Sequence, residues 1–259
     1  MSGPLALWLA KLGRVAAWVA ALLIFALPLL GTARTASAAD RSLQAGLAYT
    51  QERGDFGTTT TSTLRELAVA LRYGFKRGNV RVTVPYLWVE DRDATGATTR
   101  AQGLGNVYVA GRVWLSEQRG QRPALSVIGE VKLPTASESA GLGSGYADFT
   151  AGLGLDAFVT RDAFWFADAA YTVIGHAAND PVLNPWRLTV GGGSYLPAQF
   201  VVSAALEQRG AVYAGDPVAR EALLAVSQGS TRGWRLALSK GLTDGAPAVG
   251  ITVGAFADF

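Results

Sequence analysis

The last twelve residues, Ala248–Phe259, restrict the fold of this 259-residue chain more than any other segment. Apolar side chains occupy every second position, at Val249, Ile251, Val253, Ala255, Ala257 and Phe259. The positions between them are small or polar, with Phe256 as the exception. Successive side chains of a β-strand point to opposite faces of the sheet. The segment therefore predicts a strand between an apolar and a polar environment, with the edge strand of a soluble sheet as the alternative.

Met1–Ala38 has the features of a secretory signal peptide. Lys11 and Arg14 supply positive charge, Val15–Leu30 is an uncharged apolar run, and an A-x-A cleavage site precedes Ala39. An uncleaved anchor is the alternative, although a run of sixteen residues is short for a membrane span. We expect residues 1–38 to be removed and residues 39–259 to form the folded protein.

Composition excludes several classes of function. The chain has 23 Lys+Arg and 20 Asp+Glu, but three basic residues and no acids lie before Ala39, so the mature region is formally neutral. This balance gives no reason to expect a nucleic-acid partner. The absence of Cys excludes disulfides and thiolate chemistry, and a single His leaves only carboxylates as metal ligands. We expect no metal and no cofactor.

Twelve segments of residues 39–259 alternate at period two, and each is about long enough for a tilted strand to cross a bilayer. They are Ser42–Thr50, Thr63–Lys76, Val80–Glu90, Gly105–Ser116, Ala124–Leu133, Tyr146–Val159, Ala163–Gly175, Pro185–Tyr195, Gln199–Gln208, Arg220–Gln228, Gly233–Leu242 and Pro247–Phe259. No apolar run here is long enough for a transmembrane helix. Only helices and closed barrels pair all their backbone groups in lipid. The pattern therefore predicts an all-β fold, a single antiparallel transmembrane β-barrel of about twelve strands.

The connections between these segments alternate in length. The long ones are Gln51–Ser62, Asp91–Leu104, Pro134–Gly145, His176–Asn184 and Arg209–Ala219. The short ones are Arg77–Asn79, Glu117–Pro123, Thr160–Asp162, Leu196–Ala198 and Gly229–Arg232, and Thr243–Ala246 is short where a long loop is expected. Outer-membrane barrels have short periplasmic turns and longer external loops. We therefore expect the outer membrane of a Gram-negative bacterium, with both termini in the periplasm.

The two faces of each segment differ in polarity. In the third segment Val80, Val82 and Val84 share one face, whereas Arg81 and Thr83 share the other. We expect the apolar faces to contact outer-membrane lipid. Aromatic side chains are favoured at headgroup depth, and the candidates are Tyr73, Tyr86, Trp88, Trp165, Tyr171, Trp186 and Trp234.

Charged side chains gather on the predicted inward faces. These lumen-lining candidates are Glu66, Arg72, Arg81, Arg112, Glu130, Lys132, Asp148, Asp156, Asp168, Arg187, Glu207 and Arg235. They could line a channel, or they could pair across the lumen and close it. Hairpin counting places Lys132 near Asp148, and Arg187 near Glu207.

The same counting brings Asp156 close to Asp168. Two neighbouring carboxylates require a cation or a proton between them. Arg112 is a candidate for that cation.

The sequence offers no convincing catalytic pair. His176 is the only His, and a hydrolase would need a Ser within hydrogen-bond reach of it. Ser194 and Ser203 fall near the opposite strand ends, and no GxSxG motif is present. We expect no enzymatic activity and no catalytic residue.

Short motifs in the middle of the chain carry a family resemblance. They are G-L-G-N at Gly103–Asn106, P-A-L at Pro123–Leu125, E-V-K-L-P-T at Glu130–Thr135 and G-L-G-S-G-Y-A-D at Gly141–Asp148. In this order they resemble the outer-membrane family "Putative MetA-pathway of phenol degradation", a group of transporter-like barrels. Asn106 stands where the family has Asp, and Ala136 where it has Gly. The resemblance implies passage of small, aromatic or hydrophobic molecules.

The segment Pro134–Gly145 is predicted to constrict such a barrel. Pro134 cannot donate to the strand ladder and ends the pairing. Gly141, Gly143 and Gly145 would let the loop fold tightly into the lumen, with Lys132 and Asp148 at its base. The alternative is a loop that extends into the external medium.

Together these features predict an outer-membrane channel for passive or facilitated passage of small molecules. The alternatives are a lipid-modifying outer-membrane enzyme and a closed structural barrel. The expected partners are lipid, a small solute and the barrel assembly machinery, since the terminal Phe259 resembles its recognition signal.

Deletion of Phe259 should lower the amount of folded barrel in the outer membrane, because the assembly machinery would lose its signal. Refolding in detergent should change less, since no machinery acts there. Heat-modifiability of membrane fractions and of refolded protein on gels measures both quantities. Equal assembly of the two proteins in cells would contradict the idea.

Overall fold

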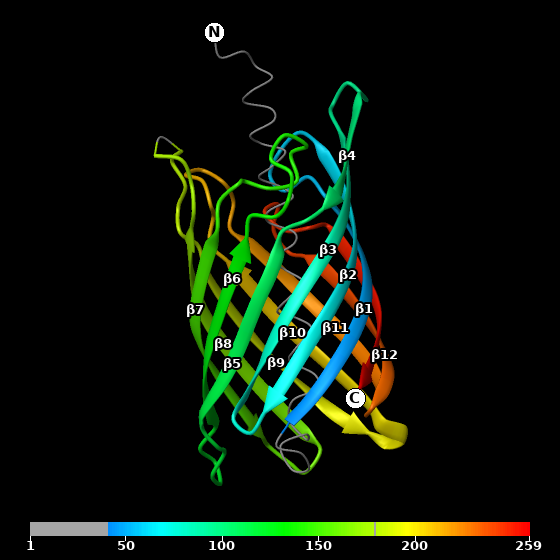
Figure 1. Cartoon of the computed structure of the whole chain (residues 1–259), viewed down its shortest axis with the longest axis vertical. Coiled ribbons are helices and arrows are strands. Elements are labelled where there is room, and N and C mark those ends of the chain that lie inside the picture. Colours follow the sequence, from blue (N-terminus) through cyan, green and yellow to red (C-terminus); the bar gives the residue numbers. More distant parts are fainter. Residues whose placement is uncertain (1–40, 179) are drawn as a thin grey trace.

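Alternating sequences of this kind form long, tilted strands in the computed structural model, which describes residues 41–178 and 180–259 (Figure 1). The strands are β1 (Arg41–Gly54), β2 (Thr61–Phe75), β3 (Gly78–Arg92), β4 (Thr98–Leu104), β5 (Val107–Ser116), β6 (Ala124–Leu133), β7 (Asp148–Phe158), β8 (Ala163–Ile174), β9 (Trp186–Leu196), β10 (Phe200–Arg209), β11 (Ala219–Gly229), β12 (Arg232–Gly241) and β13 (Val249–Asp258). A short 3-10 turn, Pro197–Gln199, joins β9 to β10. The signal-peptide prediction concerns residues outside the described ones.

Every neighbouring pair in the sheet is antiparallel, and the sheet closes on itself. β1 pairs with both β2 and β13, so that Gln44 lies opposite Arg72 on one side and Asp258 on the other. In Figure 1 the blue first strand and the red last strand lie side by side. The result is the predicted closed twelve-strand barrel, because β4 and β5 share one place beside β3.

The prediction that Asp91–Leu104 forms a loop is wrong, because β3 continues to Arg92 and Thr98–Leu104 forms β4. β3 pairs with β5 through Gly78–Thr83 and with β4 through Tyr86–Arg92, with a one-residue bulge between the two ladders. The hairpin turns at Asp93, whose carboxylate accepts hydrogen bonds from the Thr95 side chain and from backbone N–H groups. The Thr95 hydroxyl lowers the pKa of this exposed carboxyl group. β4 does not alternate apolar and polar residues as its neighbours do, since its first three residues, Thr98–Arg100, are all polar and exposed.

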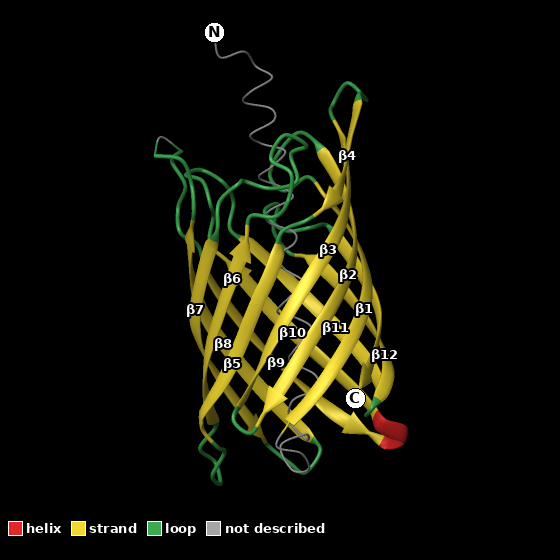
Figure 2. Ribbon diagram, in the orientation of Figure 1, coloured by secondary structure: helices red, strands yellow, loops and turns green. Residues whose placement is uncertain are grey.

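The barrel has two chemically different ends. One end, called here the loop end, carries the connections of residues 55–60, 93–97, 134–147, 175–185, 210–218 and 242–248. The other, the turn end, carries the shorter connections 76–77, 117–123, 159–162, 197–199 and 230–231. Figure 2 shows the long loops gathered at one end of the barrel. The alternation expected from the sequence is therefore present.

The outer and inner faces of the wall agree with the predicted polarity. Val80, Val82 and Val84 are exposed on the outside, whereas Arg81 and Thr83 between them are buried. The same alternation of exposed apolar and covered residues recurs in other strands, among them Leu67, Val69 and Leu71 of β2. Among the described residues, no helix has the length and apolar character needed for a membrane span.

Glycines in β9 allow aromatic rings to lie flat on the inner wall. Gly191 lies opposite Phe166 of β8, and Gly193 lies opposite Phe164. A Cβ on Gly191 would come within 2.4 Å of the Phe166 ring and 2.6 Å of the backbone oxygen of Ala204. Covering a strand glycine with a cross-strand aromatic ring is a known way of fixing register in barrels.

Gly191→Ala should therefore lower the free energy of unfolding by about 1–3 kcal/mol, the usual cost of overpacking. Urea unfolding of the barrel refolded in lipid vesicles measures the change. Gly129→Ala is the matched control, because a Cβ on Gly129 meets nothing within 4 Å. Equal stability of the two variants would contradict this account of the wall.

Candidate functional site

Several strands carry small inward side chains near their centres. They are Ala48, Ala68, Ala110, Gly152, Ala205, Ala237 and Thr252, and larger inward side chains such as Arg81, Ile128 and Leu223 lie between them. A twelve-strand barrel is wider than the eight-strand barrels whose side chains fill the interior. Small residues at this level leave that width available to a solute.

The loop between β6 and β7 folds against the inner wall at the loop end. Leu142, at 1% exposure, belongs to a buried apolar cluster with Leu64 of β2 and Leu87 of β3. Ala136 from the start of the same loop joins this cluster. The prediction that this loop folds inward is confirmed, and the loop narrows the mouth on the β2–β3 side.

The family motifs supply the contacts that hold the loop. The Thr135 hydroxyl donates to the carbonyl oxygen of Gly105 at 3.0 Å and accepts from the N–H of Val107 at 2.8 Å. The Asn106 side-chain oxygen accepts from the N–H of Ala136 at 3.2 Å. A Cβ on Gly143 would come within 2.8 Å of the Ala136 side chain. The G-L-G-N, K-L-P-T and G-L-G segments therefore form one contact surface.

Lys132 joins the base of the loop to the barrel wall. Its Nζ lies 2.6 Å from the carboxylate of Asp148 and donates to the Ser144 hydroxyl at 3.2 Å. The ion pair expected from hairpin counting is therefore present. Asp148 also accepts from the N–H of Gly175 at 3.1 Å, which connects the loops on either side of β7. A cavity of about 40 Å³ lies beside the pair, lined by Tyr108, Glu130, Lys132, Asp148, Thr150, Thr172 and Arg187.

Hairpin counting places Arg187 near Glu207, and the observed register between β9 and β10 differs from that count by two residues. Glu207 lies opposite Thr189, whose hydroxyl donates to it at 3.1 Å, and Arg187 lies opposite Arg209. The cause is the turn between β9 and β10, where Gln199 has a positive φ of 61° and belongs to the turn rather than to the strand. A count that takes Gln199 as the first residue of the strand therefore places every residue pair of this hairpin two positions out of register.

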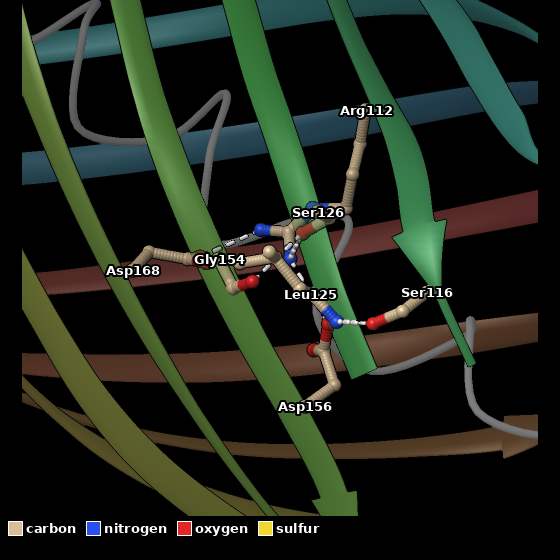
Figure 3. Close-up of polar contacts among 7 residues, drawn as sticks. All are labelled: Arg112, Ser116, Leu125, Ser126, Gly154, Asp156 and Asp168. Carbon is tan, nitrogen blue, oxygen red and sulfur yellow. Dashed lines mark hydrogen bonds and ion pairs between the residues drawn. The ribbon is translucent and has the colours of Figure 1, made fainter. Parts of the chain in front are cut away.

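Arg112 forms the second ion-pair network, nearer the turn end (Figure 3). From β5 its side chain passes Ser126 of β6 and reaches Asp168 of β8 at 2.7 Å and Asp156 of β7 at 3.3 Å. Gly154 makes room for it, since a Cβ there would come within 2.6 Å of the guanidinium nitrogen Nη1. Arg112 is thus the cation between the two carboxylates, as the sequence predicted.

Four glutamates and four arginines of the lumen lie toward opposite ends of the barrel, although Lys132, Arg187 and Arg209 accompany the glutamates and Asp156, Asp168 and Asp258 accompany the arginines. Acidic side chains come from strand portions toward the loop end, at Glu52, Glu66, Glu207 and Glu221, where Arg209 lies 3.2 Å from Glu207. Arginines come from strand portions toward the turn end, at Arg72, Arg81, Arg112 and Arg235. None of the twelve predicted lumen-lining residues is exposed.

Sequence reasoning missed two members of the acidic group, their neighbour Arg209, and Tyr108, which lines the cavity beside Lys132. Glu52 and Arg209 were assigned to loops, and Glu221 and Tyr108 were not singled out. The signal was available, because Glu52 continues the inward register of Ala48 and Thr50 beyond the predicted strand end. Arg209 continues the register of Glu207 in the same way.

Comparisons with known proteins agree with this geometry. The family model described as "Putative MetA-pathway of phenol degradation" matches residues 39–180, more than half of the chain. An outer membrane channel from Pseudomonas putida F1 has a similar structure, with a TM-score of 0.71, 11% identity, and coverage of 86% of this chain and 97% of that one.

Two further solved structures share the fold. The KdgM porin has a TM-score of 0.54 and 10% identity, covering 83% of this chain and 99% of that one. The translocator domain of the autotransporter NalP from Neisseria meningitidis has a TM-score of 0.58 and 10% identity, covering 95% and 97%. Among curated proteins, none matches the chain significantly.

Asp168→Ala should lower the free energy of unfolding by about 3 kcal/mol, because it leaves the covered Arg112 charge with one carboxylate, Asp156, at the longer distance of 3.3 Å. Urea unfolding in lipid vesicles measures the loss. Arg100→Ala removes an ion pair with Glu90 that lies largely in solvent and should cost less than about 1 kcal/mol. Equal losses in the two variants would show that the Arg112 network is as weak as a surface pair.

Proposed function

Because the chain belongs to the family "Putative MetA-pathway of phenol degradation", we propose that it is an outer-membrane channel for small aromatic or hydrophobic molecules. The observation that carries this proposal is the lining of small side chains at mid-barrel, such as Ala68, Ala110 and Ala205. These small residues leave width in the lumen beside larger inward side chains such as Ile128, and a barrel that served only as an anchor would have no need of that width.

The folded-in loop supports a selective channel over a wide pore. It is held by the apolar cluster around Leu142 and by the contacts of Lys132 to Asp148 and Ser144. Both attachments lie at the loop end, where a solute arriving from outside would enter. The loop therefore acts as the size filter of the proposed channel.

The alternative of a lipid-modifying enzyme has less support. His176 is exposed, and its Nδ1 lies 2.8 Å from the backbone oxygen of the next residue, Ala177. Among the described residues, no group of three or more His, Cys, Asp or Glu side chains could hold a metal ion. The channel proposal explains the small inward side chains and the folded-in loop, and the enzyme alternative explains neither of these features.

Reconstitution of the purified barrel into planar lipid bilayers tests the proposal. We expect discrete single-channel currents in KCl and swelling of liposomes in small uncharged aromatic solutes. A correctly folded, heat-modifiable barrel that passes neither ions nor solutes would overturn the channel proposal in favour of a closed structural barrel.

Leu142→Gln should raise the single-channel conductance, because an amide buried among Leu64 and Leu87 weakens the attachment of the loop by about 2 kcal/mol. Asp148→Ala should act in the same direction and shift selectivity toward anions, since it frees the charge of Lys132. Leu142→Met is the matched control and should keep the wild-type current, because it nearly conserves volume. Unchanged conductance in both test variants would mean that the loop does not constrict the pore.

A further inference from the structure

Three arginines near the turn end are placed close together despite their equal charge. Arg72 of β2 lies directly opposite Arg81 of β3. Arg235 of β12 projects from farther round the barrel, yet is close enough for the charge of Arg81 to act on it. Like charges directly opposite each other on paired strands destabilise a sheet. Asp258 acts on Arg72 and Glu130 acts on Arg81, so these two arginines also have acidic neighbours.

An aromatic surface lines the same end of the lumen. Phe158, Phe164 and Tyr195 lie with ring centroids 5.5–6.3 Å apart, and Phe164 and Phe166 lie over the glycines of β9. The buried cluster around these rings continues through Val201 and Ala225.

The aromatic surface meets the arginines at β12 and β13. Ala237, which packs against the buried aromatic cluster, lies two residues from Arg235 on the same strand. Phe256 of β13 lies opposite Gly233, also two residues from Arg235, and its ring lies within 2.7 Å of where a Cβ on Gly233 would be. Side chains two residues apart on a strand share a face. The ring of Phe256 and the guanidinium group of Arg235 therefore border a single stretch of lumen.

We propose that this stretch is a binding subsite for aromatic carboxylates, which rests on the proposed channel function. A guanidinium group binds a carboxylate through two parallel hydrogen bonds, and Arg72, Arg81 and Arg235 supply such groups. The ring of the solute would stack on Phe256, the partly exposed ring beside Arg235, where offset and edge-to-face contacts are favourable. Neither part alone selects this class, because arginines would hold any anion and the rings any apolar solute.

The acidic groups at the loop end determine how the subsite should be detected. Glu52, Glu66, Glu207 and Glu221 repel free anions from that part of the lumen, so a general preference for chloride is not expected. Retention of one class of anion at the turn end would instead appear as a concentration-dependent block of the KCl current.

Single-channel recording with three probes tests the subsite: benzoate, cyclohexanecarboxylate and benzyl alcohol. Benzoate should block at the lowest concentration, since it alone of the three probes has both an aromatic ring and a negative charge. Arg81→Gln should raise its half-blocking concentration about tenfold, the loss of one charged contact. Phe256→Leu should remove the difference between benzoate and cyclohexanecarboxylate. Arg100→Gln, on the exposed β4 hairpin, is the matched control and should block like wild type.

The outcomes separate this inference from the channel function. Normal KCl currents with equal block by benzoate in Arg81→Gln and Arg100→Gln would overturn the subsite and leave the channel intact. Equal block by benzoate and cyclohexanecarboxylate in the wild type would show that the subsite binds carboxylates without regard to the aromatic ring, which would overturn the proposed aromatic preference. Absence of any current in the folded wild type would overturn both. If Arg81→Gln does not refold, Arg235→Gln tests the same charge, with folding checked by heat-modifiability.

Discussion

The structure depends on the pairing of every backbone N–H and C=O group within the wall. Lipid offers no hydrogen-bond partner, so a sheet that spans it must have no free edge. β1 meets this requirement by pairing with β2 on one side and with β13 on the other, and the N–H of Phe259 still donates to the oxygen of Leu43 at 2.7 Å. Once the wall is closed, alternate side chains have only two destinations, lipid or lumen.

This constraint explains which parts of the fold could be predicted from the sequence. Where lipid contacts one face, as along Val80, Val82 and Val84, the chain must alternate, and the strand is visible in the sequence. β4 stands outside that constraint, so its polar residues Thr98–Arg100 look like a loop. Strand ends were placed too early for the same reason, which removed Glu52 and Arg209 from the predicted lumen.

Contacts within the lumen could be predicted only where neighbouring strands make them. The Lys132–Asp148 pair and the closeness of Asp156 to Asp168 involve strands that follow one another along the chain, so counting residues from each turn was enough. Arg112 reaches Asp168 over two intervening strands, and counting alone left it one candidate for the cation. One misplaced turn residue, Gln199, was also enough to misplace Arg187. The packing of Leu142 against Leu64 and Leu87 connects segments that are far apart in the sequence. No local pattern identifies these two residues as its partners.

Acidic side chains outnumber basic ones toward the loop end of the lumen, and arginines outnumber acidic side chains toward the turn end, which gives the barrel an electric dipole along its axis. Glu52, Glu66, Glu207 and Glu221 lie toward one end and Arg72, Arg81, Arg112 and Arg235 toward the other. A solute that is charged at one end only would be turned by this field as it enters, with its negative group leading toward the arginines. The barrel is therefore not equivalent in its two directions. Channels inserted in a single orientation should pass unequal currents when the sign of the voltage is reversed.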